Sequence, residues 1–137
     1  MSSLTSTTQP DMGLSMGTNP LPIAITMGDA AGIGPEIIAR AFRDAPYLTA
    51  GCFVVGNVAT LRRAARVVAG QALAMPVAVI ADAAQALFCP PNSLPVLVPG
   101  SSCDAGAFVP YGQLNAQAGQ MAGDCVVWAA NAALRGE

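Results

Sequence analysis

The chain has 137 residues, of which 53% are hydrophobic and only 10% are charged, and its formal net charge is −2. This length suffices for one domain with its own core, and the composition excludes an intrinsically disordered chain. The six basic residues are all arginines and form no basic stripe, which argues against nucleic-acid binding. No apolar run reaches the ~18 residues that a membrane-spanning helix requires.

Residues 1–21 are rich in Ser, Thr, Met, Gly and Pro, and Asp11 is their single charged residue. They lack the basic start and the apolar stretch of a signal peptide, and they lack the arginines of a transit peptide. We therefore expect a disordered N-terminal tail over residues 1–21, an α/β portion over residues 22–137, and a cytoplasmic protein.

The glycine-rich stretch at residues 23–38 predicts a buried strand, a tight turn and the start of a helix. Residues 23–27 are apolar and partly β-branched, as in a buried parallel strand. Three glycines mark the turn: Gly28, Gly32 and Gly34. Pro35 suits the first helical position. Such a turn can bind an anion at the helix start, or it can be a tight connection without any ligand. It matches neither the P-loop nor the G-x-G-x-x-G fingerprint.

Strand and helix patterns alternate through the rest of the chain. The predicted strands are residues 23–27, 52–55, 76–80 and 94–98, and the predicted helices are residues 36–43, 58–69 and 114–135. Residues 81–87 are predicted as a short helix or an irregular connection, and residues 99–112 as a long loop. This alternation predicts an α/β domain with a largely parallel sheet, and Pro95 indicates an edge strand or the beginning of a strand.

The helical patterns also predict buried faces and ends. In residues 36–43 the apolar stripe is Ile37, Ile38, Ala41 and Phe42, and in residues 58–69 it is Leu61, Ala64, Ala65 and Val68. Asn57 and Asn115 are the expected N-caps, and Gly70 is the expected C-terminal stop. We interpret Arg62, Arg63 and Arg66 as a solvated face rather than a phosphate site.

The last helical pattern carries mostly small residues, which predicts close packing on a sheet or another helix, with Trp128 as a core or interface anchor. This small-residue stripe is Ala118, Met121, Ala122, Cys125, Ala129, Ala132 and Ala133.

The cysteines predict no metal site or disulfide within this chain. They are widely spaced, at Cys52, Cys89, Cys103 and Cys125, and the chain has no histidine. Reduced and mostly buried thiols are the favoured interpretation. Because lysine is absent as well, the usual groups for proton transfer are missing, and we predict no catalytic residue and no metal ligand here.

The segment Met27-Gly-Asp-Ala-Ala-Gly-Ile-Gly-Pro-Glu-Ile-Ile38 closely resembles the G-D-P-A-G-I-G-P-E signature of the 4-hydroxythreonine-4-phosphate dehydrogenase family, which belongs to pyridoxal 5′-phosphate biosynthesis. Residues 53–65 resemble that family's second strand and helix, and residues 112–119 resemble its G-x-x-[S/N]-x-x-x-G entry to a long helix. The resemblance runs from about Pro22 to the last residue and covers only the N-terminal portion of the family.

The resemblance implies an isopropylmalate-dehydrogenase-like fold with two α/β domains flanking a cleft, and a homodimer. It also implies NAD or NADP and a divalent metal (Zn, Mg or Co) held by three histidines across the dimer interface. No residue of this chain matches those ligands, so we expect them outside it. Gly32, Ile33 and Gly34 would line the cofactor side of the cleft. Asp29 would brace the turn, Glu36 could be only a helix-start residue, and Ala30 stands where the family usually has proline.

The activity so implied is the oxidation of 4-(phosphooxy)-L-threonine to the 3-oxo acid, which decarboxylates to 3-amino-2-oxopropyl phosphate. Sister enzymes that act on threonate or erythronate 4-phosphate, or on cis-dihydrodiols of aromatic acids, are the alternative. A catalytically inactive, truncated fragment is a third interpretation. The expected partner is a phosphorylated small molecule, with no nucleic acid and no membrane, and the 137 residues alone are expected to be inactive.

Overall fold

The structure is a computed structural model that describes residues 20–104 and 109–137, so the tail predicted for residues 1–21 lies almost wholly outside the described residues. The strands are β1 (Ile23–Thr26), β2 (Cys52–Val55), β3 (Val77–Ile80) and β4 (Leu94–Leu97). The helices are α1 (Gly34–Asp44), α2 (Val58–Ala69), the 3-10 helix η1 (Ala83–Phe88), α3 (Ser101–Asp104) and α4 (Ala116–Arg135).

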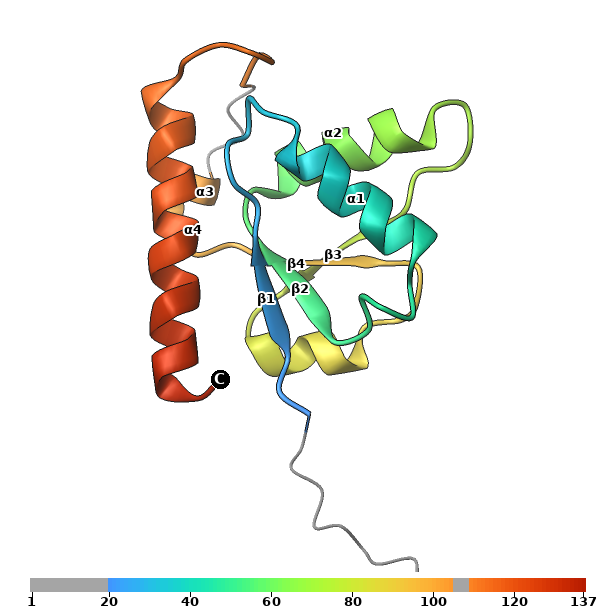
Figure 1. The fold of residues 1–137 in the computed structure, drawn as a ribbon, viewed down its shortest axis with the longest axis vertical. Helices are drawn as coiled ribbons and strands as arrows, with labels where there is room; N and C mark the ends of the chain where they lie inside the picture. Colours follow the sequence, from blue (N-terminus) through green and yellow to red (C-terminus); the bar gives the residue numbers. More distant parts are fainter. Residues whose placement is uncertain (1–19, 105–108) are drawn as a thin grey trace, which may run out of the picture.

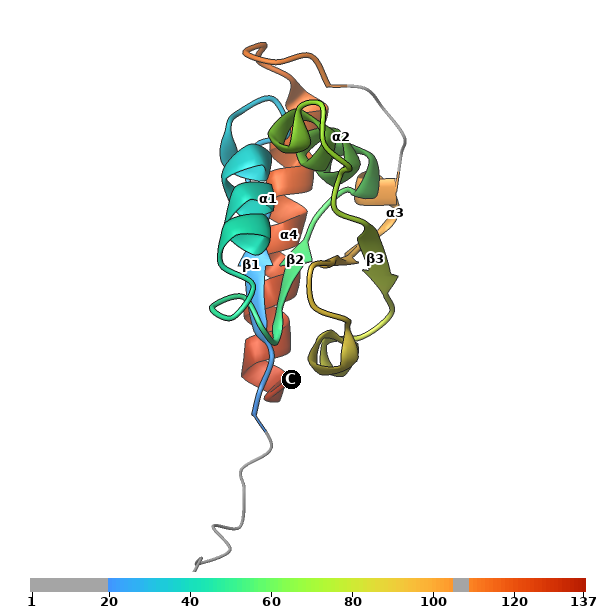
Figure 2. The ribbon, with the colours of Figure 1, turned by 90° about the vertical axis from the view of Figure 1, so that its right-hand side faces the viewer.

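The four strands form one sheet in the order β1-β2-β4-β3, and every neighbouring pair is parallel. Helices α1 and α2 pack together on one face of the sheet, and α4 lies along β1 and β2 on the other face (Figures 1 and 2). This arrangement confirms the predicted α/β class with a parallel sheet.

The core lies on both faces of the two inner strands. Every residue of β2 and β4 is buried, whereas β1 and β3 are edge strands and stay partly exposed. Phe42 of α1, Leu61 of α2 and Met121 of α4 pack into this core. The half-buried Trp128 contacts Phe53 edge-on, with ring centroids 6.0 Å apart, so its predicted role as a core anchor is confirmed.

Local signals set most helix boundaries as predicted. Asn57 accepts a hydrogen bond from the backbone N–H of Thr60 (2.8 Å), and Asn115 accepts from the first turn of α4. Gly70 ends α2 with a φ of 60°. Within the small-residue stripe of α4, Ala118, Met121, Cys125 and Ala132 are buried, while Ala133 is exposed.

Three details differ from the sequence-based expectations. The buried residues of α1 are Pro35, Ala39 and Phe42. Of the predicted stripe, Phe42 is buried and Ile38 is partly buried against the core, whereas Ala41 is exposed and Ile37 is 59% exposed. The loop predicted for residues 99–112 contains α3, where the N–H of Cys103 bonds to the carbonyl of Gly100. Finally, β4 is an inner strand, so the edge position considered for Pro95 is wrong.

Pro95 is tolerated in an inner strand because its missing N–H falls where β2 and β4 are not yet paired. Leu97 directs its carbonyl to β2, where it accepts from Gly56, and Pro95 two residues earlier faces the same side. The β2–β4 register begins only at Val54 and Val96. Pro95 therefore removes no ladder hydrogen bond, as at the beginning of a strand.

Across residues 20–104 and 109–137, no helix combines the length and the apolar character needed to cross a membrane.

Candidate functional site

The glycine turn follows β1 at the carboxyl edge of the sheet. Gly28 has a φ of 75°, a left-handed conformation that favours glycine. The carboxylate of Asp29 accepts a hydrogen bond from the N–H of Ala31 (2.9 Å), and the carbonyl of Asp29 accepts from Gly32 (3.1 Å). The prediction that Asp29 braces the turn is therefore confirmed.

Gly34 is required by the packing of the turn on β1. A Cβ at this position would lie 2.9 Å from the carbonyl oxygen of Met27, which is too close for any larger residue without a backbone shift. Ile33 stands at the N-cap of α1 with a helical φ, ψ and no side-chain cap, and Pro35 follows in the first turn. The internal geometry of the turn thus explains this glycine without a ligand.

The turn borders a hollow of about 350 Å³. Its lining is Ala31, Gly32, Ile33, Glu36, Val67 and Tyr111. Ile33 is 71% exposed and Val67 is 57% exposed, so two large aliphatic side chains present apolar surface here to the solvent. Of the predicted cofactor residues, Gly32 and Ile33 line this hollow, and Gly34 packs behind them against β1.

Tyr111 forms one wall of the hollow and belongs to residues 109–112, which we call the strap. The N–H of Gly112 bonds to the carbonyl of Ala31 (2.9 Å), and the Tyr111 hydroxyl donates to the Glu36 carboxylate (2.5 Å). This hydrogen bond to Glu36 is the main cause that raises the pKa of Tyr111, followed by burial. Glu36 is therefore more than a helix-start residue, since it anchors the strap to α1.

Arg63 joins the strap to the turn, which corrects its predicted place on a solvated helix face. Its guanidinium donates to the carbonyls of Val109 (2.6 Å) and Ala30 (2.8 Å), and it lies 4.2 Å from the centre of the Tyr111 ring. Arg62 and Arg66 are exposed, as expected. Helical periodicity could not reveal the role of Arg63, because its partners are supplied by segments 33 and 46 residues away in sequence.

A buried polar cluster lies between the carboxyl ends of β2 and β4. The Asn57 side chain, 2% exposed, donates to the carbonyl of Cys103 (2.6 Å), and the Sγ atoms of Cys103 and Cys125 are 3.9 Å apart. Burial, with a smaller contribution from Cys103, raises the pKa of Cys125 to about 12. A thiol with such a pKa stays protonated at neutral pH and is a poor nucleophile and a poor metal ligand.

The described residues offer no metal centre. All four cysteines are free thiols, three of them buried, which agrees with the sequence-based interpretation. Within the part of the chain that the structure describes, no three His, Cys, Asp or Glu side chains come together as a set of ligands. The residues present therefore do not fit a divalent cation.

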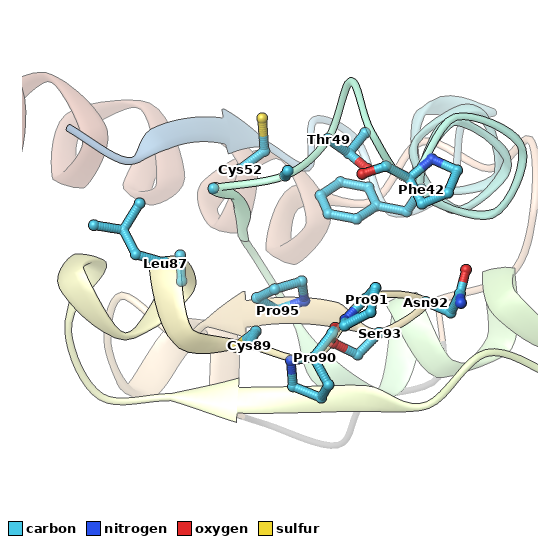
Figure 3. A pocket seen from close by; sticks show the side chains of 14 residues that line it. Phe42, Thr49, Cys52, Leu87, Cys89, Pro90, Pro91, Asn92, Ser93 and Pro95 are labelled. Carbon is cyan, nitrogen blue, oxygen red and sulfur yellow. Dashed lines mark hydrogen bonds between the residues drawn. The ribbon is translucent and has the colours of Figure 1, made fainter. Parts of the chain in front are cut away.

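A second pocket, of about 190 Å³, lies at the opposite, amino edge of the sheet (Figure 3). Pro90, Pro91 and Pro95 lie on one side of it, and Phe42 and Thr49 on the other. Cys52 and Cys89 also border this pocket, and burial raises the pKa of both thiols. It contains none of the predicted site residues and no ionised side chain, so the hollow beside the glycine turn is the better candidate site.

Comparison with known proteins agrees with the motif. No family model matches the chain. The chain is 37% identical over 115 residues to the D-threonate 4-phosphate dehydrogenase of Salmonella typhimurium, which covers 84% of this chain and 34% of that protein. It is 35% identical over 115 residues to the 4-hydroxythreonine-4-phosphate dehydrogenase of Beijerinckia indica, which covers 84% of this chain and 32% of that protein.

The fold is similar to solved structures as well. The crystal structure of a 4-hydroxythreonine-4-phosphate dehydrogenase from Burkholderia phymatum matches with a TM-score of 0.69 and 33% identity, over 86% of this chain and 34% of that one. The chain thus spans about a third of the length of the relatives it matches. Over the residues it shares with them, the chain belongs to the family of 4-hydroxythreonine-4-phosphate and D-threonate 4-phosphate dehydrogenases.

Proposed function

We propose that the chain is the N-terminal portion of an NAD(P)-dependent and divalent-metal-dependent dehydrogenase that oxidises 4-(phosphooxy)-L-threonine to its 3-oxo acid. That acid loses carbon dioxide and leaves 3-amino-2-oxopropyl phosphate, a precursor in pyridoxal 5′-phosphate biosynthesis. The observation that carries the proposal is the similarity to named dehydrogenases over 84% of the chain. The glycine turn, which carries the sequence motif, borders the hollow.

The hollow fits the flat, apolar face of a nucleotide base or nicotinamide ring. Ile33 and Val67 offer exposed aliphatic surface, and Tyr111 offers an aromatic wall. In this proposal Gly32, Ile33 and Gly34 border the cofactor; when bound, its nicotinamide would accept the hydride from C3, the substrate carbon that bears the hydroxyl, while the hydroxyl loses its proton. In this proposal the described residues form one wall of the cofactor site and orient the cofactor, and they supply no acid or base.

The metal ligands of the proposed enzyme lie outside this chain, because the chain has no histidine and its described carboxylates and thiols form no cluster. By the same resemblance we propose a cytoplasmic homodimer of two-domain, isopropylmalate-dehydrogenase-like subunits. Both the metal site and the substrate phosphate site then depend on the remaining polypeptide, and the 137 residues alone are inactive.

A second candidate substrate is D-threonate 4-phosphate, which carries a hydroxyl at C2 where 4-(phosphooxy)-L-threonine carries an ammonium. Relatives named for D-threonate 4-phosphate are 36–42% identical to the chain over 99–117 residues, and relatives named for 4-hydroxythreonine 4-phosphate are 31–37% identical over 82–115 residues, so this second substrate has comparable support. Erythronate 4-phosphate and cis-dihydrodiols remain further alternatives by resemblance alone. Because specificity here depends on a partner for the C2 group, a substrate panel separates these candidates.

The test is reduction of NAD or NADP by the complete gene product with each candidate substrate, in the presence and absence of a divalent metal. We expect metal-dependent reduction with one of the two phosphorylated acids and no turnover by the 137 residues alone. Ile33→Gln should raise the KM for the cofactor about tenfold by removing apolar contact. Ile37→Gln, which changes an exposed isoleucine outside the hollow, is the matched control. Absence of any turnover by the complete gene product with these substrates would contradict the proposed function.

A further inference from the structure

We propose that Arg63 is a positioning residue for the cofactor turn, which it fixes by holding the strap (residues 109–112) against it. This inference rests on the proposed function for its consequence in catalysis, but its structural part is independent of it. The guanidinium of Arg63 contacts both segments: it donates to Ala30 in the turn at 2.8 Å and to Val109 in the strap at 2.6 Å.

The chemistry of the contact suits arginine and no other residue type. A planar guanidinium presents several N–H donors in a fixed fork, so one side chain can satisfy two carbonyls and still stack on an aromatic ring. Here it also lies 4.2 Å from the centre of the Tyr111 ring. Hydrogen bonds from a charged donor in a half-buried position are stronger than neutral ones, because solvent competes less for the donor.

The contacts converge on the two peptides that precede the predicted cofactor residues. Arg63 holds the carbonyl of Ala30, and the N–H of Gly112 holds the carbonyl of Ala31 at 2.9 Å. Gly32 and Ile33 follow directly, so their position depends on these two anchored carbonyls. The Tyr111 hydroxyl closes the arrangement on Glu36, at the start of α1, so the strap is tied at both sides of the hollow.

The first test is amide hydrogen exchange of the 137-residue protein. Arg63→Met should speed exchange at the amides of Ala31, Gly32 and Gly112 by at least about tenfold, the factor expected for loss of a charge-assisted hydrogen bond. Arg62→Met, which removes the neighbouring exposed arginine, should leave these rates unchanged. The amides of Val54 and Val96 in the inner strands report whether a change is confined to the turn. Equal turn exchange in the two variants overturns the proposal.

Two further variants keep the test decisive if Arg63→Met does not fold. Arg63→Lys keeps the charge but offers a single ammonium. We therefore expect the turn amides to exchange faster than in the wild type, but by less than the roughly tenfold expected for Arg63→Met. Tyr111→Phe keeps the ring beneath Arg63 and removes the bond to Glu36, so it should loosen the strap less than Arg63→Lys. Wild-type exchange in Arg63→Lys would contradict the need for a forked donor.

The second test uses the complete gene product and separates positioning from a purely structural role. If Arg63 positions the cofactor turn, Arg63→Lys should raise the KM for NAD about fivefold to tenfold and leave kcat within about twofold. Faster turn exchange with an unchanged KM overturns the positioning role. If the complete wild-type protein oxidises no candidate substrate, the proposed function fails, and the exchange experiment alone decides whether Arg63 fixes the turn.

Discussion

At Gly34 the absence of a side chain lets the start of α1 approach β1. The nearest atom to an added Cβ is the backbone oxygen of Met27, at 2.9 Å, and backbone cannot move aside as a flexible side chain can. Gly123, in the exposed middle of α4, has no neighbour within 4 Å of the same added atom. Packing therefore constrains Gly34 but not Gly123, although both lie within helices.

Gly34→Ala should lower the free energy of unfolding by about 1–3 kcal/mol, because the turn must shift to relieve the overlap. Gly123→Ala should raise it by up to about 1 kcal/mol, since alanine is the better helix former and nothing is displaced. Urea denaturation of the two variants and the wild type measures both changes. A stabilised Gly34→Ala variant would show that the turn is not tightly packed on β1.

Single residues were predicted correctly where their partners are close in sequence. Asp29 and Asn57 bond to backbone N–H groups two and three residues ahead, which sequence patterns can foresee. The role of Arg63 was missed because its partners come from the turn and the strap. Tyr111 and Glu36, 75 residues apart, were missed for the same reason.

At the level of elements, Asn57, the N-cap of α2, does more than start a helix. Besides capping Thr60, Asn57 donates at 2.6 Å to the carbonyl of Cys103, a residue with no exposed surface, and so links α2 to α3. Asn115 caps α4 in a similar way, with bonds to Gln117 and Ala118. Comparing alanine variants at these two caps therefore gives the contribution of the Asn57–Cys103 hydrogen bond to the free energy of unfolding.

Asn115→Ala should cost about 1 kcal/mol of unfolding free energy, the usual value for a lost cap. Asn57→Ala should cost about 2–4 kcal/mol, because it removes a cap and also a donor to a buried carbonyl, which adds about 1–3 kcal/mol. Chemical denaturation monitored by circular dichroism compares the two variants under identical conditions. Equal losses would mean that the Asn57–Cys103 bond contributes nothing to stability.

The sequence predicts where helices and strands begin and end more reliably than which of their residues are buried. Asparagine caps, glycine stops and short apolar runs are local signals, so the strands and the three long helices were found within a few residues. Which face of α1 is buried depends on where α2 and the sheet lie, and the apolar Ile37 was wrongly assigned to the core. The inner position of Pro95 depends on β4 inserting between β2 and β3, a choice of strand order that local patterns do not encode.

For the whole molecule, the composition limits the chemistry that the chain can supply. A chain without histidine or lysine lacks the residues that most often transfer protons, and its described carboxylates and thiols form no ligand cluster. Its relatives are about three times as long, and the match covers 34% of the Salmonella protein. The family could be predicted from one motif, whereas the substrate could not, because relatives named for two different substrates share this part of the chain.

The 137-residue protein should therefore bind neither Mn²⁺ nor Mg²⁺ in isothermal titration calorimetry, whereas the complete gene product should bind one divalent ion per subunit and lose turnover with a chelator. If Zn²⁺ is titrated as well, the Cys103→Ser/Cys125→Ser double variant is the control for weak binding of that ion by the thiols. Stoichiometric Mn²⁺ binding by the 137 residues would contradict the assignment of the metal ligands to the remaining polypeptide.

The strand order has a further consequence for where a ligand can sit. Neighbouring strands β2 and β4 send their following helices to opposite faces, and in open α/β sheets ligands usually bind in the crevice that opens between two such strands. Here the Met27 side chain and the Asn57 carboxamide fill that place. The accessible hollow lies instead on the outer side of α1 and α2. A ligand held there keeps one side uncovered, so under the proposed function the hollow would form one wall of a cleft and the facing domain would supply the other.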